Sequence, residues 1–354
     1  MQSYFARCIR GLESLCEREL RSLEGLDIKK KEIRTLFFTY PKEALDLVKL
    51  KSVDVVFLFL AKIEGLDHTR ASLGKIEEGL ASLAIDFPEV IQQIKKLRTL
   101  AAKPSFGLTV GLQGKKNFSR FELAERVLPF FKEKLGINYI PNEPASPAAD
   151  LDFRISLEGE NLYLGLRLEK KPLHRRPYKQ HNRPGSTKAP LAYILASLAE
   201  IKAGDKVLDP CCGVGSILME AATSFEAAQF FGTDINASAI SSSKEHAKHL
   251  GLDIDLQEAD AGNLPFESLF FDHIIVNPPW GRQVAKELDI PSLYERFFAE
   301  FSRLLKVGGN LICLTDQEDW MKNHLKSSKS FREIAHWDLS LFGSVVRIYQ
   351  WEKG

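Results

Sequence analysis

The sequence has few of the residues that build metal sites and disulfide frameworks. None of its five cysteines belongs to a Cys-x-x-Cys pair or has a histidine at metal-ligand spacing; they are Cys8, Cys16, Cys211, Cys212 and Cys313. This pattern argues against a zinc site and against a set of disulfides, and it fits a reducing compartment. We therefore expect no bound metal and a cytoplasmic location.

Long apolar runs and a net charge of one sign are also missing. No stretch reaches the roughly twenty apolar residues that a membrane helix needs, and residues 1–7 lack the apolar core of a signal peptide. The 48 Lys and Arg nearly balance the 47 Asp and Glu, which leaves a net charge of +1. Any binding to nucleic acid must therefore come from a local basic patch.

The first half of the chain alternates short strand-like and helix-like segments. Residues 1–63 show a β-α-β-β-α-β order that includes a helix after Pro41, and residues 64–168 predict a second small α+β module. At 44% hydrophobic residues, the 354-residue chain can supply each module with its own core.

The second half, residues 189–354, alternates strands with helices from Lys206 onward. Strands are expected at 206–209, 229–234, 254–259, 273–277 and 310–315, followed by a terminal hairpin at 332–341 and 345–351. Such alternation predicts an α/β domain whose sheet is seven-stranded and mostly parallel, with helices on both faces and one antiparallel strand.

A glycine turn follows the first strand of this domain. The strand 207–209 ends on Asp209, and Gly213 and Gly215 open the next helix, as in turns where backbone amides approach a nucleotide-like ligand. A dinucleotide-binding turn requires a third glycine three residues further, where this chain has Leu218. A nicotinamide dehydrogenase is therefore the least favoured interpretation.

Three acids come at the ends of successive strands. Asp209 can accept from an ammonium group, Asp234 from ribose hydroxyls and Asp260 from an adenine amine. Each alone could simply cap the following helix, but the series favours S-adenosylmethionine. The candidate cofactor-binding residues are Asp209, Pro210, Cys211, Gly213, Gly215, Ser216, Asp234, Ile235, Asp260, Ala261 and Asn277.

The fourth strand ends in an Asn-Pro-Pro-Trp loop, and its residues Asn277, Pro278, Pro279 and Trp280 are the candidate catalytic group. The Asn277 oxygen and the Pro278 carbonyl can accept both hydrogens of an exocyclic amine, which helps its nitrogen to attack a sulfonium methyl. Pro279 stiffens the loop, and Trp280 offers a face on which a base can stack. The alternative is a loop that only ends a strand, with Trp280 in the core.

A basic linker, residues 169–188, joins the two halves of the chain. It contains no acid between residues 170 and 188, and its basic and aromatic side chains could contact phosphates at the mouth of the site. The alternative is a solvated linker punctuated by prolines. The candidate RNA-binding residues are Lys170, Lys171, Arg175, Arg176, Tyr178, Lys179 and Arg183.

These motifs resemble the THUMP-domain RNA guanine-N2 methyltransferases over nearly the whole chain. The specific part is the Asp209 turn, residues 209–216, together with the loop at Asn277. The resemblance implies a ferredoxin-like domain at 1–63, a THUMP domain at 64–168 that recognises RNA, and a Rossmann-fold methyltransferase domain at 189–354.

The resemblance also implies S-adenosylmethionine-dependent formation of N2-methylguanosine in RNA, with tRNA and its acceptor stem as the expected substrate. Three alternatives stay open: a methyltransferase for large-subunit ribosomal RNA, a DNA adenine-N6 methyltransferase, and an RNA-binding protein with a vestigial methyltransferase fold. We expect a monomer whose partner is RNA and which binds neither membranes nor metals.

Overall fold

The computed structural model describes residues 2–141, 148–181, 183–282, 287–327, 330–341 and 343–354. The chain divides into two compact units. The first consists of Met1–Cys8 and Glu17–Leu173, and the second of Ile9–Cys16 and His174–Gly354. Within the described ranges, no helix is long and apolar enough to cross a membrane.

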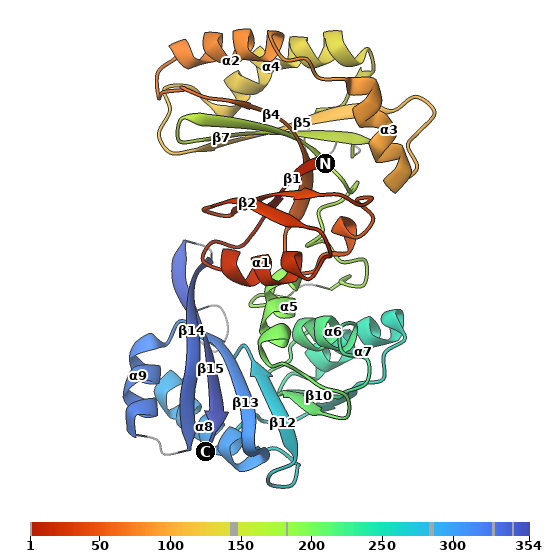
Figure 1. Ribbon diagram of the computed structural model, residues 1–354. Helices are drawn as coiled ribbons and strands as arrows, with labels where there is room; N and C mark the ends of the chain where they lie inside the picture. Colours follow the sequence, from red (N-terminus) through yellow and green to blue (C-terminus); the bar gives the residue numbers. More distant parts are fainter. Residues whose placement is uncertain (1, 142–147, 182, 283–286, 328–329, 342) are drawn as a thin grey trace. The chain divides into compact units, whose positions relative to one another are not determined.

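The first unit is built on an eight-stranded sheet. Figure 1 labels its strands β1, β2, β4, β5 and β7. Its strands pair in the order β2-β3-β1-β4-β8-β7-β5-β6. They are β1 (Gln2–Arg7), β2 (Asp27–Glu32), β3 (Thr35–Tyr40), β4 (Val55–Ile63), β5 (Ser105–Gln113), β6 (Asn138–Tyr139), β7 (Leu151–Glu158) and β8 (Asn161–Arg167). The helices of this unit are α2 (Ala71–Ala81), α3 (Phe87–Leu97), α4 (Arg120–Leu135) and the part of α1 (Glu13–Arg21) from Glu17 onward.

The antiparallel pairing of β4 with β8 makes this sheet continuous. The sequence predicted two separate modules at 1–63 and 64–168, and those boundaries stay a prediction, but one sheet runs through both ranges. The helix expected after Pro41 is wrong, because only a 3-10 turn, η1 (Leu47–Lys49), forms there. The single 3-10 turn already buries Leu47 completely. A segment of three residues forms too few hydrogen bonds to offset the free-energy cost of nucleating an α-helix.

The second unit has the predicted seven-stranded sheet, in the order β11-β10-β9-β12-β13-β15-β14. The α/β fold class is confirmed, and the last hairpin places β15 antiparallel to both of its neighbours. The strands are β9 (Lys206–Asp209), β10 (Gln229–Asp234), β11 (Asp255–Glu258), β12 (Phe271–Val276), β13 (Leu305–Thr315), β14 (Phe331–Leu341) and β15 (Ser344–Lys353).

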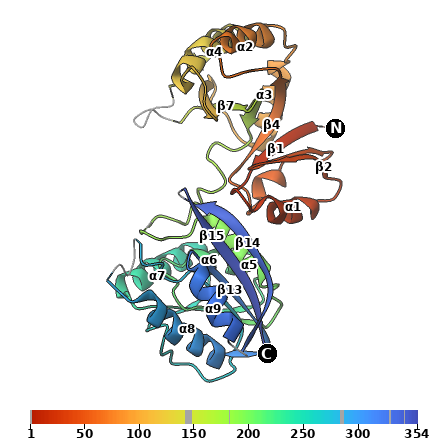
Figure 2. The same ribbon diagram turned by 90° about the vertical axis from the view of Figure 1, so that its left-hand side faces the viewer.

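Helices cover both faces of this sheet (Figures 1 and 2). On one face lie α5 (Ala189–Leu198), α6 (Ser216–Ala222) and α7 (Ala237–Leu250). On the other, α8 (Ile290–Leu304) and α9 (Glu318–Ser327) pack against an aromatic core that includes Phe271, Phe298 and Trp351. The central strands carry apolar side chains on both faces. Polar groups that bind a ligand are therefore expected at the carboxyl ends of these strands.

Candidate active site

The order of the strands brings the two main motifs together. β9 pairs in parallel with β10 on one side and with β12 on the other, so the chain reverses its direction of travel across the sheet between β9 and β12. Asp209 ends β9, and Asn277 directly follows β12. Ligands of open α/β sheets bind at such a switch point, outside the carboxyl ends of the strands.

Asp209 lies at the bottom of the turn and is almost fully buried, with 1% of its surface exposed. Its Oδ1 accepts from the backbone N–H of Cys211 at 3.2 Å. Burial raises the pKa of the Asp209 carboxyl well above its usual range, and the nearby charge of Asp234 adds to the effect, although the Cys211 N–H opposes it. A bound cation would relieve this cost, so the carboxylate is suited to an ammonium group.

The turn that follows is tied to the neighbouring strand. The N–H of Gly213 donates to Asp234 Oδ2 at 2.9 Å, and Asp234 Oδ1 accepts from the N–H of Asn236 at the same distance. Gly213 has a φ of +54°, and a Cβ placed on it would meet nothing within 4 Å. The positive φ explains the glycine, and the open space beside it leaves room for a ligand against the turn.

Gly215 has a different reason to be a glycine. Its φ is +79°, and a Cβ there would lie 2.2 Å from the hydroxyl oxygen of Ser243 on α7. The residue therefore lets the turn pack against a helix, rather than opening the turn to a ligand as the sequence suggested. The next residue, Ser216, has a buried hydroxyl that finds no hydrogen-bond partner within the described ranges.

The remaining candidates for cofactor binding lie at the ends of β10 and β11. Ile235 follows Asp234 and is 72% exposed, which is unusual for an isoleucine and suits a flat apolar ligand. Asp260 accepts from the N–H of Gly262 at 2.9 Å and from Arg296 at 2.5 Å. Burial works against its ionisation, but these two donors prevail and lower the pKa of Asp260. Ala261 is buried in the core of the unit.

Asn277 presents one side of its amide to the chain and leaves the other without a partner. Its Nδ2 donates to the Thr187 hydroxyl oxygen at 3.1 Å and to the Gly185 carbonyl at 3.3 Å. Its Oδ1 is buried, and none of the described residues donates to it. An orphaned buried acceptor at this place fits the predicted contact with the hydrogen of an amine.

The rest of the loop is fixed at several points. Tyr294 donates its hydroxyl to the Pro279 carbonyl at 3.2 Å, and Gln317 donates to the Trp280 carbonyl at the same distance. The indole N–H of Trp280 donates to the Leu314 carbonyl, near the end of β13, also at 3.2 Å. Pro278 is buried, while Trp280 keeps part of its ring exposed. These tethers hold the indole in one orientation on the loop that begins with Asn277.

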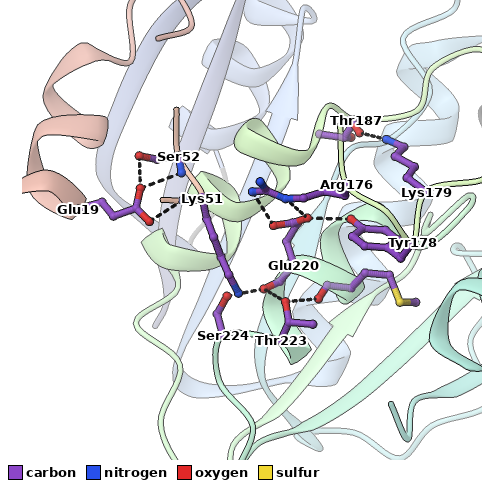
Figure 3. A network of polar contacts seen from close by, with 11 residues as sticks. Glu19, Lys51, Ser52, Arg176, Tyr178, Lys179, Thr187, Glu220, Thr223 and Ser224 are labelled. Atoms are coloured by element: carbon purple, nitrogen blue, oxygen red, sulfur yellow. Dashed lines mark hydrogen bonds and ion pairs between the residues drawn. The ribbon is translucent and has the colours of Figure 1, made fainter. Parts of the chain in front are cut away.

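The basic linker is docked onto the second unit from His174 onward, and we call residues 174–188 the strap; residue 182 lies outside the described residues. Figure 3 shows its main anchor, the carboxylate of Glu220 on α6. Arg176 binds both oxygens, Nε to Oε1 at 3.0 Å and an Nη to Oε2 at 3.1 Å, and the Tyr178 hydroxyl donates to Oε1 at 2.8 Å. Glu220 and Tyr178 are 1% and 4% exposed.

Arg176 and Tyr178 therefore have an internal partner in Glu220, and their contact with RNA stays a prediction. Burial, together with the Glu220 charge, raises the pKa of the Tyr178 hydroxyl. Lys179 also turns inward, and its Nζ donates to the Thr187 carbonyl at 2.5 Å (Figure 3). Its burial lowers the pKa of Lys179 to about 8, against the opposing effect of Glu220. The other proposed RNA-binding residues, Lys170, Lys171, Arg175 and Arg183, are exposed or partly exposed.

A histidine connects the strap to the glycine turn. The backbone N–H of His181 donates to His246 Nε2 at 3.1 Å, so the proton of this imidazole resides on Nδ1, which lies 2.9 Å from the Val214 carbonyl. Burial is the main cause that lowers the pKa of His246, which agrees with a neutral ring. The strap thus contacts α6 through Glu220, α7 through His246, which in turn bonds the glycine turn, and finally Asn277.

Sequence reasoning missed Glu220, Thr187 and the tethers of the loop. Glu220 did carry a signal, since it is the one acid in the apolar segment 216–222 and a buried acid needs a partner. Thr187 and Gln317 carried none, because their contacts depend on how distant segments meet.

Comparisons with known proteins agree with this geometry. The model of the RMKL-like methyltransferase domain family matches residues 176–339. A tRNA (guanine(6)-N2)-methyltransferase of Thermus thermophilus is 30% identical over 91% of both chains. The crystal structure of TrmN from Thermus thermophilus superposes with a TM-score of 0.80 at 26% identity and covers 100% of both chains. A bovine U6 snRNA (guanine-N(2))-methyltransferase, THUMPD2, is 33% identical over 51% of this chain and 35% of its own length.

The chain belongs to the THUMP-domain RNA guanine-N2 methyltransferases. It is an enzyme that uses S-adenosylmethionine as its methyl donor. The residues fit this cofactor, since the buried Asp209 carboxylate suits its ammonium group, the open side of Gly213 leaves room for it, and Ile235 offers an exposed apolar surface. In the ranges described, no group of three or more His, Cys, Asp or Glu is placed to hold a metal ion.

Proposed function

We propose that this enzyme methylates the N2 amine of a guanine in the acceptor stem of tRNA, at the position 6 that the name of its Thermus relative gives. Support for tRNA comes from that relative, which matches along 91% of its own length. The U6 snRNA relative matches over only 35% of its length. The family assignment also favours RNA guanine over DNA adenine as the acceptor.

The observation that carries the chemistry is the orphaned Oδ1 of Asn277. The N2 lone pair of guanine is delocalised into the ring, so the amine is a poor nucleophile until its hydrogens are held by acceptors. Asn277 Oδ1 and the Pro278 carbonyl accept these two hydrogens, which localises the lone pair on nitrogen. Bound S-adenosylmethionine supplies an electrophilic methyl group. Catalysis then consists of positioning the amine for in-line transfer, and the nitrogen releases one of its two protons to solvent as it gains the methyl group.

Trp280 supplies the stacking surface for the guanine. A base inside a stem must leave the helical stack before an enzyme can reach its amine, and the lost stacking has to be replaced. The partly exposed indole, held by its N–H to the Leu314 carbonyl, offers a flat face on the same loop as Asn277. Because the ring is already held in one orientation, it loses little conformational entropy when the base binds.

The substrate can be tested directly. The enzyme and labelled S-adenosylmethionine are incubated with unmodified tRNA and with ribosomal RNA, and the product is mapped by nuclease digestion and mass spectrometry. We expect N2-methylguanosine in tRNA, and its loss when guanine 6 of the transcript is replaced by adenine. Label found in ribosomal RNA alone would overturn the tRNA assignment.

Two variants separate the acceptor site from the cofactor site. Asn277→Ala should abolish methylation and change the affinity for S-adenosylmethionine, measured by calorimetry, far less than Asp234→Ala does. Asp234→Ala should weaken that affinity about tenfold or more, because a charged acceptor is lost at the turn. Asp255→Ala, at the exposed opposite end of β11, is the matched control. Full activity of Asn277→Ala would refute its role.

A further inference from the structure

The side-chain amide of Asn277 could in principle bind the strap in either of two orientations. A rotation of 180° about its last bond would exchange Oδ1 and Nδ2, and the amide would then offer N–H groups to the substrate in place of an oxygen. Only the orientation with Oδ1 toward the substrate can hold an amine. Something in the protein must therefore select it.

The strap makes this selection. The Gly185 carbonyl can only accept a hydrogen bond, so the amide atom that faces it at 3.3 Å must be Nδ2. The Thr187 hydroxyl oxygen lies 3.1 Å from the same nitrogen and accepts its second hydrogen. With both N–H groups used, Oδ1 is left on the other side, buried and without a partner among the described residues.

Thr187 is itself held firmly enough to act as a reference point. It is 8% exposed, and its carbonyl accepts from the partly buried Lys179. The strap before it is fixed to Glu220 through Arg176 and Tyr178, and the residue after it, Lys188, is the N-cap of α5. Loss of its hydroxyl would thus not be compensated by movement of the chain.

We propose that Thr187 is a positioning residue for methyl transfer: the Gly185 carbonyl selects which amide atom of Asn277 faces the strap, and the Thr187 hydroxyl, by accepting the second N–H, fixes the angle of the amide so that its oxygen receives the acceptor amine. This inference rests on the proposed function and deepens it. It also explains how the site distinguishes an amine from a carbonyl: the fixed oxygen attracts an N–H donor and repels another oxygen, so the N2 edge of guanine is favoured over its O6 edge.

The test is the isosteric variant Thr187→Val, compared with Thr187→Ser, which keeps the hydroxyl. We expect Thr187→Val to lower kcat for tRNA methylation about 10- to 100-fold, the usual cost of a misplaced reacting group. The KM for tRNA, the Kd for S-adenosylmethionine and the melting temperature should change little, because Gly185 still binds the amide and only the angle of the amide is released. Thr187→Ser should restore kcat to near the wild-type value.

The matched control is Thr39→Val on β3, where the Thr39 hydroxyl is buried and has no partner among the residues described. It should leave kcat unchanged. An active wild type together with an unaffected Thr187→Val would overturn this inference alone, and so would a Thr187→Ser variant as impaired as Thr187→Val. A wild type that methylates no RNA would overturn the proposed function and the inference with it.

Discussion

Leu218 on α6 packs directly over Gly232 on β10. A Cβ placed on Gly232 would lie 2.4 Å from Cδ1 of Leu218 and 2.7 Å from Cδ2 of Leu256. In dinucleotide-binding folds the helix carries a glycine at the position of Leu218, and this lets helix and strand approach each other. Here the strand carries the glycine instead and the helix the large side chain. The close approach of helix and strand that a third glycine on the helix would allow is provided here by Gly232 on the strand.

Gly232→Ala should therefore destabilise the second unit. The added methyl group overlaps with two buried leucine side chains, and overpacking of this kind costs about 1–3 kcal/mol. Urea unfolding followed by circular dichroism should show a lower midpoint. Gly74→Ala is the control, because Gly74 lies in α2 with nothing within 4 Å of its Cβ position, and alanine there should stabilise the helix by up to about 1 kcal/mol. Equal midpoints for the two variants would contradict this packing.

The parts of the site that the sequence predicted are those that depend on strand ends. Asp209, Asp234 and Asn277 each follow an apolar segment, and parallel strands of one sheet end at the same edge. Periodicity was therefore enough to place them together. It could not show which strands are neighbours, and the position of the switch point between β9 and β12 came only from the structure.

The parts that the sequence did not predict depend on long-range contacts of side chains. A basic segment with prolines looks the same whether it is solvated or docked, and the buried partner of Arg176 is 44 residues away. The pairing of β4 with β8 joins segments about a hundred residues apart. Local propensity contains no information on such contacts, because they form only when whole elements pack.

Lys179 should make the stability of the enzyme depend on pH in the alkaline range. Burial lowers its pKa from 10.5 to about 8 in the folded chain. Below pH 8 the Lys179 amine is charged in the folded and in the unfolded chain. Only the folded chain has to bury this charge, which lowers its free energy of unfolding. Between about pH 8 and 10.5 the unfolded chain binds more protons, so the free energy of unfolding rises with pH through this window.

Lys179→Met should remove this dependence. The variant should be more stable than the wild type at pH 7, by up to about 3 kcal/mol, and the difference should shrink steadily as the pH approaches 10.5. Chemical unfolding at several pH values measures it. Lys244→Met, on the exposed surface of α7, should track the wild type throughout. A difference that stays constant with pH would show that Lys179 has an ordinary pKa.

Lys171 and Arg175 are exposed and should contribute to RNA binding through phosphates. The double variant Lys171→Ala with Arg175→Ala should weaken tRNA binding at low salt. It should also reduce the slope of log K against log salt by about one for each lost phosphate contact. Filter binding over a salt series measures both. Lys95→Ala with Lys96→Ala, on the exposed side of α3, is the matched control, and an equal change of slope there would remove any special role for the linker.

Gly281 closes the catalytic loop and should be required for its geometry. Its φ is +75°, and a Cβ at this position would lie 2.8 Å from Cγ1 of Ile290 at the start of α8. Gly281→Ala therefore combines a strained backbone with a steric overlap, and the loop must shift to relieve them. Because Trp280 is the adjacent residue and Asn277 lies four residues before, the shift displaces the acceptor site and leaves the glycine turn of β9 in place. We expect kcat for tRNA methylation to fall about 10- to 100-fold, with an unchanged Kd for S-adenosylmethionine by calorimetry.

Gly308→Ala separates the steric overlap from the backbone strain. Gly308 has a φ of +78° but no atom within 4 Å of its Cβ position. The variant therefore carries the same backbone strain far from the loop and should retain the wild-type kcat. If both variants lost activity equally, backbone strain in the unit would be the cause and the contact with Ile290 would have no part in it.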